Sequence, residues 1–145
     1  DSVPNELGVD RSSMRVFLAE DSKFIRSIML SVLRGSGYAE VNVFNNGAET
    51  YQALVKDVEA GGTDNRIILA DIEMPLMDGL ALTKNIRQHA VLGKAPVVLF
   101  SSVITEDTRH KGEEVGADDQ LSKPQLPELV AVLDRWVNKQ HLEAA

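Results

Sequence analysis

Short runs of apolar residues alternate with longer amphipathic segments along most of the chain. Such alternation is typical of a parallel β-sheet whose two faces are covered by helices. The sequence therefore predicts an α/β fold, a three-layer α/β/α sandwich around a five-stranded parallel sheet. The strands are expected at 16–19, 41–43, 67–70, 97–100 and 120–121, and the helices at about 24–33, 48–58, 79–89, 105–115 and 126–139.

The second apolar run differs from its neighbours. Val41-Asn42-Val43 alternates apolar and polar residues, whereas residues 16–19 and 67–70 are continuously apolar. This alternation is typical of a half-exposed strand, here at the edge of the sheet. We therefore expect the strand order 2-1-3-4-5, a flavodoxin-like topology. Open sheets with this order bind ligands beyond the carboxyl ends of the strands, between the first and third strands.

Composition limits the classes of function. The 145 residues, 43% of them hydrophobic, suit a globular domain, and the formal net charge of −7 argues against a nucleic-acid partner, which needs clustered Lys and Arg. The absence of cysteine excludes disulfides and thiolate metal sites. The chain has neither an apolar stretch long enough to cross a bilayer nor the features of a signal peptide. We therefore expect a cytoplasmic protein without membrane insertion.

The polarity of the chain also divides it into three parts. Residues 1–13 are polar and unpatterned, so we expect a tail or a linker there. Residues 14–140 carry all the predicted strands and helices and form the expected domain. Residues 141–145 are expected to be a C-terminal tail.

Three carboxylates are predicted to meet at one edge of the sheet. Glu20 and Asp21 follow the first strand, and Asp71 ends the third. Mutual repulsion would raise the pKa values of such a cluster, and a hard divalent cation with oxygen ligands relieves it. The sequence therefore predicts a Mg²⁺ site.

Two further polar residues are expected at the same edge, because Ser101 ends the fourth strand and Lys123 follows the fifth. These groups suit phosphoryl transfer. A carboxylate attacks phosphorus, metal and lysine neutralise the phosphoryl oxygens, and the hydroxyl donates a hydrogen bond. Asp71 lies centrally and is the predicted nucleophile, while Glu20 and Asp21 are better placed to hold the metal.

Each of these residues also has a simpler structural interpretation. The pair Glu20-Asp21 could be the acidic start of a helix, and Asp71 could cap a loop. Ser101 is an ordinary loop residue, and Lys123 an ordinary surface lysine. Independent structural roles do not predict convergence on one sheet edge, so the combination favours a functional site.

The order and spacing of these residues resemble the receiver domain of two-component response regulators, over about residues 14–139. This family has the flavodoxin/CheY-like fold and accepts a phosphoryl group from a histidine kinase. The residues that carry the resemblance are Glu20-Asp21, the segment Asp71-Ile72-Glu73-Met74-Pro75-Leu76-Met77-Asp78-Gly79, Ser101 and Lys123-Pro124.

The resemblance implies a role for each matching residue. Asp21, Asp71 and the backbone carbonyl of Glu73 would ligate Mg²⁺, and Glu20 would act through a bound water. Lys123 would contact the phosphoryl group on Asp71. The domain itself would be a signalling domain, with at most intrinsic self-phosphorylation and self-dephosphorylation, and not an enzyme.

The resemblance also implies an output. Ser101 would move toward phosphorylated Asp71 and thereby shift the surface formed by the fourth helix, fifth strand and fifth helix. A cis peptide would join Lys123 to Pro124. Glu73 and Val103 would flank the path of the attacking water and tune dephosphorylation.

Within the family, the motifs are most similar to the receiver of CheV, a chemotaxis coupling protein. The matching segments are Ala19-Glu20-Asp21-Ser22, Asp71-Ile72-Glu73-Met74-Pro75, Phe100-Ser101-Ser102 and Gln120-Leu121-Ser122-Lys123-Pro124. This similarity implies a CheA-like histidine kinase as phosphoryl donor. It also implies attachment to a chemoreceptor array through a CheW-like module that this chain does not contain, with the linker at residues 1–13.

Two positions depart from the family pattern. Glu20 stands where most receivers carry Asp, which changes the reach of this side chain toward the metal. Gln120 stands where an aromatic residue is usual. Either conformational coupling runs through hydrogen bonds of Gln120, or the domain mainly holds phosphate.

Two other functions fit parts of the pattern. A Mg²⁺-dependent phosphohydrolase would also use an aspartate nucleophile, but it would carry that residue after the first strand, with a second Asp where Glu73 stands. A receiver-like docking module that is not phosphorylated would be expected to have lost an acid or the lysine, and this chain retains all of them.

Overall fold

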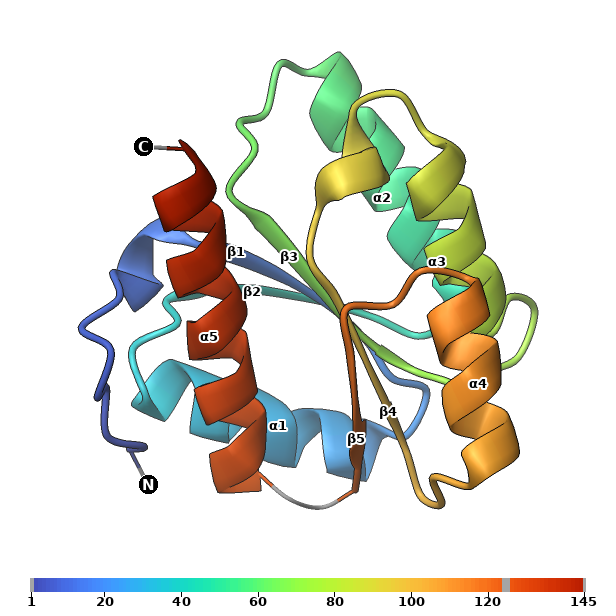
Figure 1. Cartoon of the computed structure of the whole chain (residues 1–145), viewed down its shortest axis with the longest axis horizontal. Helices are drawn as coiled ribbons and strands as arrows, with labels where there is room; N and C mark the ends of the chain where they lie inside the picture. The colour runs from blue at the N-terminus through green and yellow to red at the C-terminus, as the bar shows by residue number, and fades with distance from the viewer. Residues whose placement is uncertain (1, 124–125, 145) are drawn as a thin grey trace.

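In the computed structural model, which describes residues 2–123 and 126–144, a parallel sheet is covered by helices on both faces (Figure 1). The strand order is β2-β1-β3-β4-β5, as the sequence predicts. Every neighbouring pair is parallel, so all five carboxyl ends lie along one edge. The strands are β1 (Arg15–Ala19), β2 (Glu40–Phe44), β3 (Arg66–Asp71), β4 (Val97–Ser101) and β5 (Asp119–Ser122).

Helices α1 and α5 cover one face of the sheet, and α2, α3 and α4 cover the other (Figure 1). Within the described residues, no helix is both long and apolar enough to span a membrane. Two 3₁₀ turns lie at Arg11–Ser13 and Leu92–Lys94. The helices are α1 (Lys23–Gly35), α2 (Gly47–Glu59), α3 (Gly79–Gln88), α4 (Glu106–Glu114) and α5 (Leu126–Ala144).

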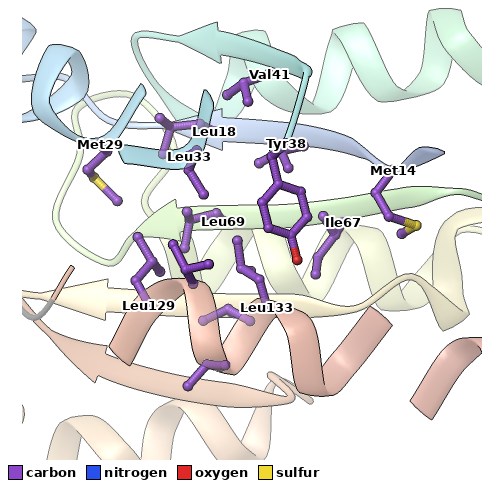
Figure 2. Close-up of a cluster of buried hydrophobic side chains, with 14 of the residues drawn as sticks. Met14, Leu18, Met29, Leu33, Tyr38, Val41, Ile67, Leu69, Leu129 and Leu133 are labelled. Atoms are coloured by element: carbon purple, nitrogen blue, oxygen red, sulfur yellow. The ribbon is translucent and has the colours of Figure 1, made fainter. Parts of the chain in front are cut away.

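The core consists of two apolar layers, one on each face of the sheet. Figure 2 shows the layer beneath α1 and α5, where Leu33 and Leu133 from the helices meet Leu18 and Leu69 from the central strands. The second layer lies beneath α2 and α3. All six residues of β3 are buried, whereas Val41 is the one buried residue of β2. Val43 is exposed, so the alternation of buried and exposed residues expected for 41–43 is not seen, although β2 does lie at the edge of the sheet. The sheet edge that carries the predicted site therefore lies at the ends of buried central strands.

The C-terminal end of the chain differs from expectation. The helix predicted for 126–139 runs on to Ala144, so residues 141–144 continue α5 instead of forming a separate tail. No Gly or Pro follows Pro127 in this helix, and Gln140 Nε2 donates to the carbonyl oxygen of Asp64 at 3.0 Å.

The N-terminal segment also differs from a free polar tail, because Arg11 anchors it to the domain. The guanidinium is buried and forms two hydrogen bonds to Asp134 on α5, at 2.5 and 2.9 Å. It also donates to the carbonyl oxygens of Val3 and Ser36. Tyr38 donates its hydroxyl to the same carboxylate at 2.7 Å. A buried guanidinium needs several acceptors, and those offered by α5 and by the end of α1 explain why this segment packs here.

Candidate functional site

The predicted site residues are placed by backbone hydrogen bonds that continue the sheet beyond the strand ends. The amide of Glu20 donates to the carbonyl oxygen of Phe44 at 3.1 Å, and that of Lys123 donates to the carbonyl oxygen of Ser101 at 2.8 Å. Asp71 is the last residue of β3 and lies in register with Phe100 on β4. These hydrogen bonds fix the main chain at Glu20 and Lys123, and the strand register fixes it at Asp71.

Glu20, Asp21 and Asp71 come together as the sequence predicts. Each offers a carboxylate oxygen, and these oxygens all lie within 4.8 Å of one another. Glu20 is 0% and Asp71 3% exposed, whereas Asp21 is exposed. Glu20 is also held by the start of α1, because its Oε2 accepts the amide of Ser22 at 2.9 Å.

Lys123 joins two of these acids. Its Nζ lies 2.8 Å from Asp71 Oδ2 and 2.6 Å from Glu20 Oε1. The second oxygen of Asp71, Oδ1, accepts the backbone amide of Glu73 at 3.0 Å. Both oxygens of the predicted nucleophile are thus held in place by donors. The expected cis peptide to Pro124 lies outside the described residues.

Burial and the neighbouring charges together shift the pKa values of the clustered groups. Burial, together with repulsion from Asp21, raises the pKa of Asp71 against the opposing hydrogen bonds from Lys123 and the Glu73 amide. Burial likewise raises the pKa of Glu20. Burial alone would lower the pKa of Lys123, but its bonds to Asp71 and Glu20 outweigh that effect and raise it. Three acids and one lysine leave an excess of negative charge.

This donor set fits Mg²⁺. The ion prefers oxygen ligands, and carboxylates that belong to different segments already lie close enough to share one cation. Burial, and to a lesser extent repulsion between the acids, raises the pKa values of Glu20 and Asp71, and a bound cation would favour their charged forms. The residues present therefore supply both the ligand type and the charge that a divalent cation requires.

The acids line an open cleft of about 520 Å³, and Ser101 is absent from its lining. Its hydroxyl instead donates to Glu73 Oε1 at 2.6 Å. Neither this side-chain contact nor the place of Ser102 in the lining of the cleft was predicted from the sequence. The cleft is lined by Glu20, Asp21, Ser22, Ile25, Asp71, Glu73, Ser102 and Lys123.

The loop after β3 brings the start of α3 against the nucleophile. The amide of Gly79 donates to the carbonyl oxygen of Ile72 at 3.1 Å, and a Cβ atom at Gly79 would overlap the carbonyl of Asp71. Asp78 caps the helix by accepting the amide of Ala81 at 2.8 Å. The Asp78-Gly79 pair therefore allows α3 to begin directly beside Asp71.

Gln120, the departure from the family pattern, points inward. It is 7% exposed, and its Nε2 donates to the carbonyl oxygen of Arg109 on α4 at 2.8 Å. Gly112, the buried residue of α4, leaves space for the amide. Gln120 Oε1 is buried and accepts no hydrogen bond from any residue the structure describes. The contact between β5 and α4 at this position is therefore polar.

The fold and the cluster of acids define a domain of the flavodoxin-like class, and comparisons with known proteins identify its family. The sequence profile of the response regulator receiver domain matches residues 16–134. The chain belongs to this family, which serves two-component signalling with a histidine kinase as partner.

Among curated relatives, the DNA-binding transcriptional regulator NtrC of Escherichia coli K12 is 36% identical over 125 residues, which is 85% of this chain and 24% of NtrC. The transcriptional regulatory protein BaeR of E. coli O6:H1 is 31% identical over 127 residues, 87% of this chain and 49% of BaeR. The chain thus spans half or less of these relatives, and their activities as whole proteins do not transfer to it.

Two solved structures show the same fold. Chemotaxis protein CheY4 of Vibrio cholerae superposes with a TM-score of 0.72 at 28% identity, covering 84% of this chain and 97% of CheY4. The receiver domain of the sensor histidine kinase PA1611 of Pseudomonas aeruginosa gives 0.73 at 25% identity, covering 86% and 97%. The PA1611 structure has a magnesium ion coordinated in its active-site cleft.

Proposed function

We propose that Asp71 accepts a phosphoryl group from a histidine kinase in the presence of Mg²⁺. The observation that carries this proposal is the contact of 2.8 Å between Asp71 Oδ2 and Lys123 Nζ, at the wall of a cleft that also contains Glu20 and Asp21. A carboxylate that is buried, held by two donors and open to a cleft is suited to attack at phosphorus.

The chemical step is a displacement at phosphorus. A carboxylate oxygen of Asp71 forms the new P–O bond while the P–N bond of the donor phosphohistidine breaks. The imidazole nitrogen leaves with the electron pair of that bond. Lys123 shifts from the carboxylate to the transferred group, where its charge stabilises the phosphoryl oxygens.

The residues that would hold Mg²⁺ are Asp21, Asp71 and the backbone carbonyl of Glu73, with Glu20 acting through a water. Bound Mg²⁺ supplies positive charge to the phosphoryl oxygens. Glu20 lies 2.6 Å from Lys123, so it also orients the lysine.

The proposed setting is cytoplasmic chemotaxis signalling of the CheV type, with a CheA-like kinase as donor and a CheW-like module linking the domain to a chemoreceptor array. The support is the motif similarity around Glu20, Asp71 and Lys123 together with the fold similarity to CheY4. The proposed output surface is α4-β5-α5. Either the domain signals to a partner through this surface, or it buffers phosphate. The polar contact of Gln120 with Arg109 favours signalling.

The test is the intact mass of the protein after incubation with acetyl phosphate and Mg²⁺. We expect one added phosphoryl group, which Asp71→Asn and removal of Mg²⁺ both abolish. Transfer from a purified phosphorylated CheA-like kinase then tests the donor. A folded protein that gains no mass, with the label protected from hydrolysis, would instead be a docking module.

A further inference from the structure

The hydroxyl of Ser101 is already engaged by a side chain outside the cluster of acids. Ser101 Oγ donates to Glu73 Oε1 at 2.6 Å and accepts the amide of Val103 at 3.4 Å. Ser101 is 1% exposed, whereas Glu73 is an exposed residue on the loop after β3. A short bond to a charged acceptor is among the stronger hydrogen bonds in proteins.

We infer that Glu73 is a positioning residue, which holds the Ser101 hydroxyl away from Asp71 until a phosphoryl group is present. This inference rests on the proposed phosphorylation of Asp71. A serine hydroxyl has one proton to donate. A full hydrogen bond to a phosphoryl oxygen on Asp71 therefore requires the bond to Glu73 to break.

The arrangement of Glu73 connects the two groups directly. Its backbone amide donates to Asp71 Oδ1 at 3.0 Å, while its side chain accepts from Ser101. One residue thus contacts both the nucleophile and the hydroxyl. A change at Asp71 that moves this amide also moves the acceptor of Ser101.

Competition for one proton has a thermodynamic consequence. A ligand shifts an equilibrium only by the difference in its affinity for the two states. Breaking the Ser101–Glu73 hydrogen bond costs free energy. The binding free energy of a phosphoryl group or phosphoryl mimic is therefore less favourable by that amount. Removing the acceptor should strengthen binding, provided that Ser101 is present to donate.

The negative charge of Glu73 has to be separated from its hydrogen bond, because the charge also repels a phosphoryl group. Glu73→Gln removes the charge but retains a side-chain oxygen that can accept from Ser101. Glu73→Ala removes both. The comparison of Gln with Ala at this position therefore isolates the hydrogen bond, and Ser101→Ala provides the matched background in which it cannot form.

The experiment is calorimetric titration of the full chain and these variants with beryllofluoride, a phosphoryl mimic, in the presence of Mg²⁺. We expect Glu73→Ala to bind roughly three- to tenfold more tightly than Glu73→Gln, in line with the loss of one competing hydrogen bond. In the Ser101→Ala background this difference should vanish. The Val103 amide resonance should shift in Glu73→Ala without ligand, because Val103 donates to Ser101 Oγ.

Equal affinities of the Gln and Ala variants in the Ser101 background would overturn the inference and leave a charge effect alone. A Gln-to-Ala difference that persists in the Ser101→Ala background would overturn it as well. A wild-type protein that binds no beryllofluoride and gains no phosphoryl mass would overturn the proposed function, and the inference with it.

Discussion

Lys123 Nζ lies 2.8 Å from Asp71 Oδ2, so the proposed nucleophile and its charged partner are in contact before any phosphoryl group arrives. The same nitrogen lies 2.6 Å from Glu20 Oε1. The lysine therefore competes with a cation for two of the three clustered acids. It also sits where the transferred group must be neutralised.

Replacing Lys123 by Met should affect metal binding and phosphorylation in opposite directions. Mg²⁺ should bind more tightly, because the acids lose a competing positive charge. Phosphorylation by acetyl phosphate should slow on the order of 100-fold, because the phosphoryl oxygens lose a fixed charge. Mg²⁺ titration and the rate of mass gain check these outcomes, with the exposed Lys111→Met as control. A variant that loses both Mg²⁺ affinity and phosphorylation rate would contradict the view that Lys123 competes with the cation for Asp71 and Glu20.

Asp71→Asn should stabilise the fold in a manner that depends on pH. Burial raises the pKa of Asp71, so the folded protein binds this proton more tightly than the unfolded chain. As the pH rises through the folded-state pKa, the wild type therefore loses stability that the Asn variant keeps. The Tm of the variant should exceed that of the wild type by most at neutral pH, and the gap should close toward the ordinary carboxylate pKa. A Tm difference between the variant and the wild type that grows as the pH falls would contradict a raised pKa of Asp71 in the folded protein.

Mg²⁺ should raise the Tm of the wild type, because an ion that binds the folded state stabilises it. At a concentration ten times the Kd, the stabilisation is about 1.4 kcal/mol. Asp21→Asn should weaken this response without unfolding the protein, since Asp21 is exposed. Asp107→Asn, an exposed change on α4, is the matched control. An Asp21→Asn variant with the full Mg²⁺ response would remove Asp21 from the proposed ligands.

The arrangement of the sheet and the meeting of Glu20, Asp71 and Lys123 could be predicted from the sequence. Apolar runs mark buried strands, and the carboxyl ends of parallel strands share one edge. A residue that directly ends or follows such a strand therefore has little freedom in where it lies. The helix ends were less predictable, as the extension of α5 to Ala144 illustrates.

The side-chain partners could not be predicted, because they depend on rotamers and on contacts between distant segments. Ser101, at the end of β4, donates to Glu73, which is 28 residues away on the loop after β3. Arg11 meets Asp134, which is 123 residues away, and residues 1–13 carry no periodic pattern that would reveal their packing. In both cases the two residues are distant in sequence and are brought together only by the tertiary structure.

Asp134→Ala should destabilise the domain strongly, because it leaves the buried guanidinium of Arg11 without its carboxylate and Tyr38 without its acceptor. Breaking a buried pair by removing one partner costs about 3–5 kcal/mol. Urea unfolding would measure the loss, and Asp64→Ala, whose carboxylate is exposed, should cost much less. If Asp134→Ala lowered the free energy of unfolding no more than Asp64→Ala does, the contact of Arg11 with Asp134 would contribute little to the stability of the fold.

Gly112→Ala should destabilise the contact between α4 and β5, although alanine ordinarily favours a helix. A Cβ atom at Gly112 would overlap the side-chain amide of Gln120, which donates to the carbonyl oxygen of Arg109. Overpacking of this kind costs about 1–3 kcal/mol.

The matched test of this overlap is Gly112→Ala combined with Gln120→Ala, because the smaller side chain removes the clash. The double variant should recover stability relative to Gly112→Ala alone, and thermal unfolding of the four proteins gives the coupling energy. Additive losses would show that the helix adjusts without pressing on Gln120. A positive coupling would show that the amide of Gln120 packs against α4, and therefore that this side chain links two elements of the proposed output surface.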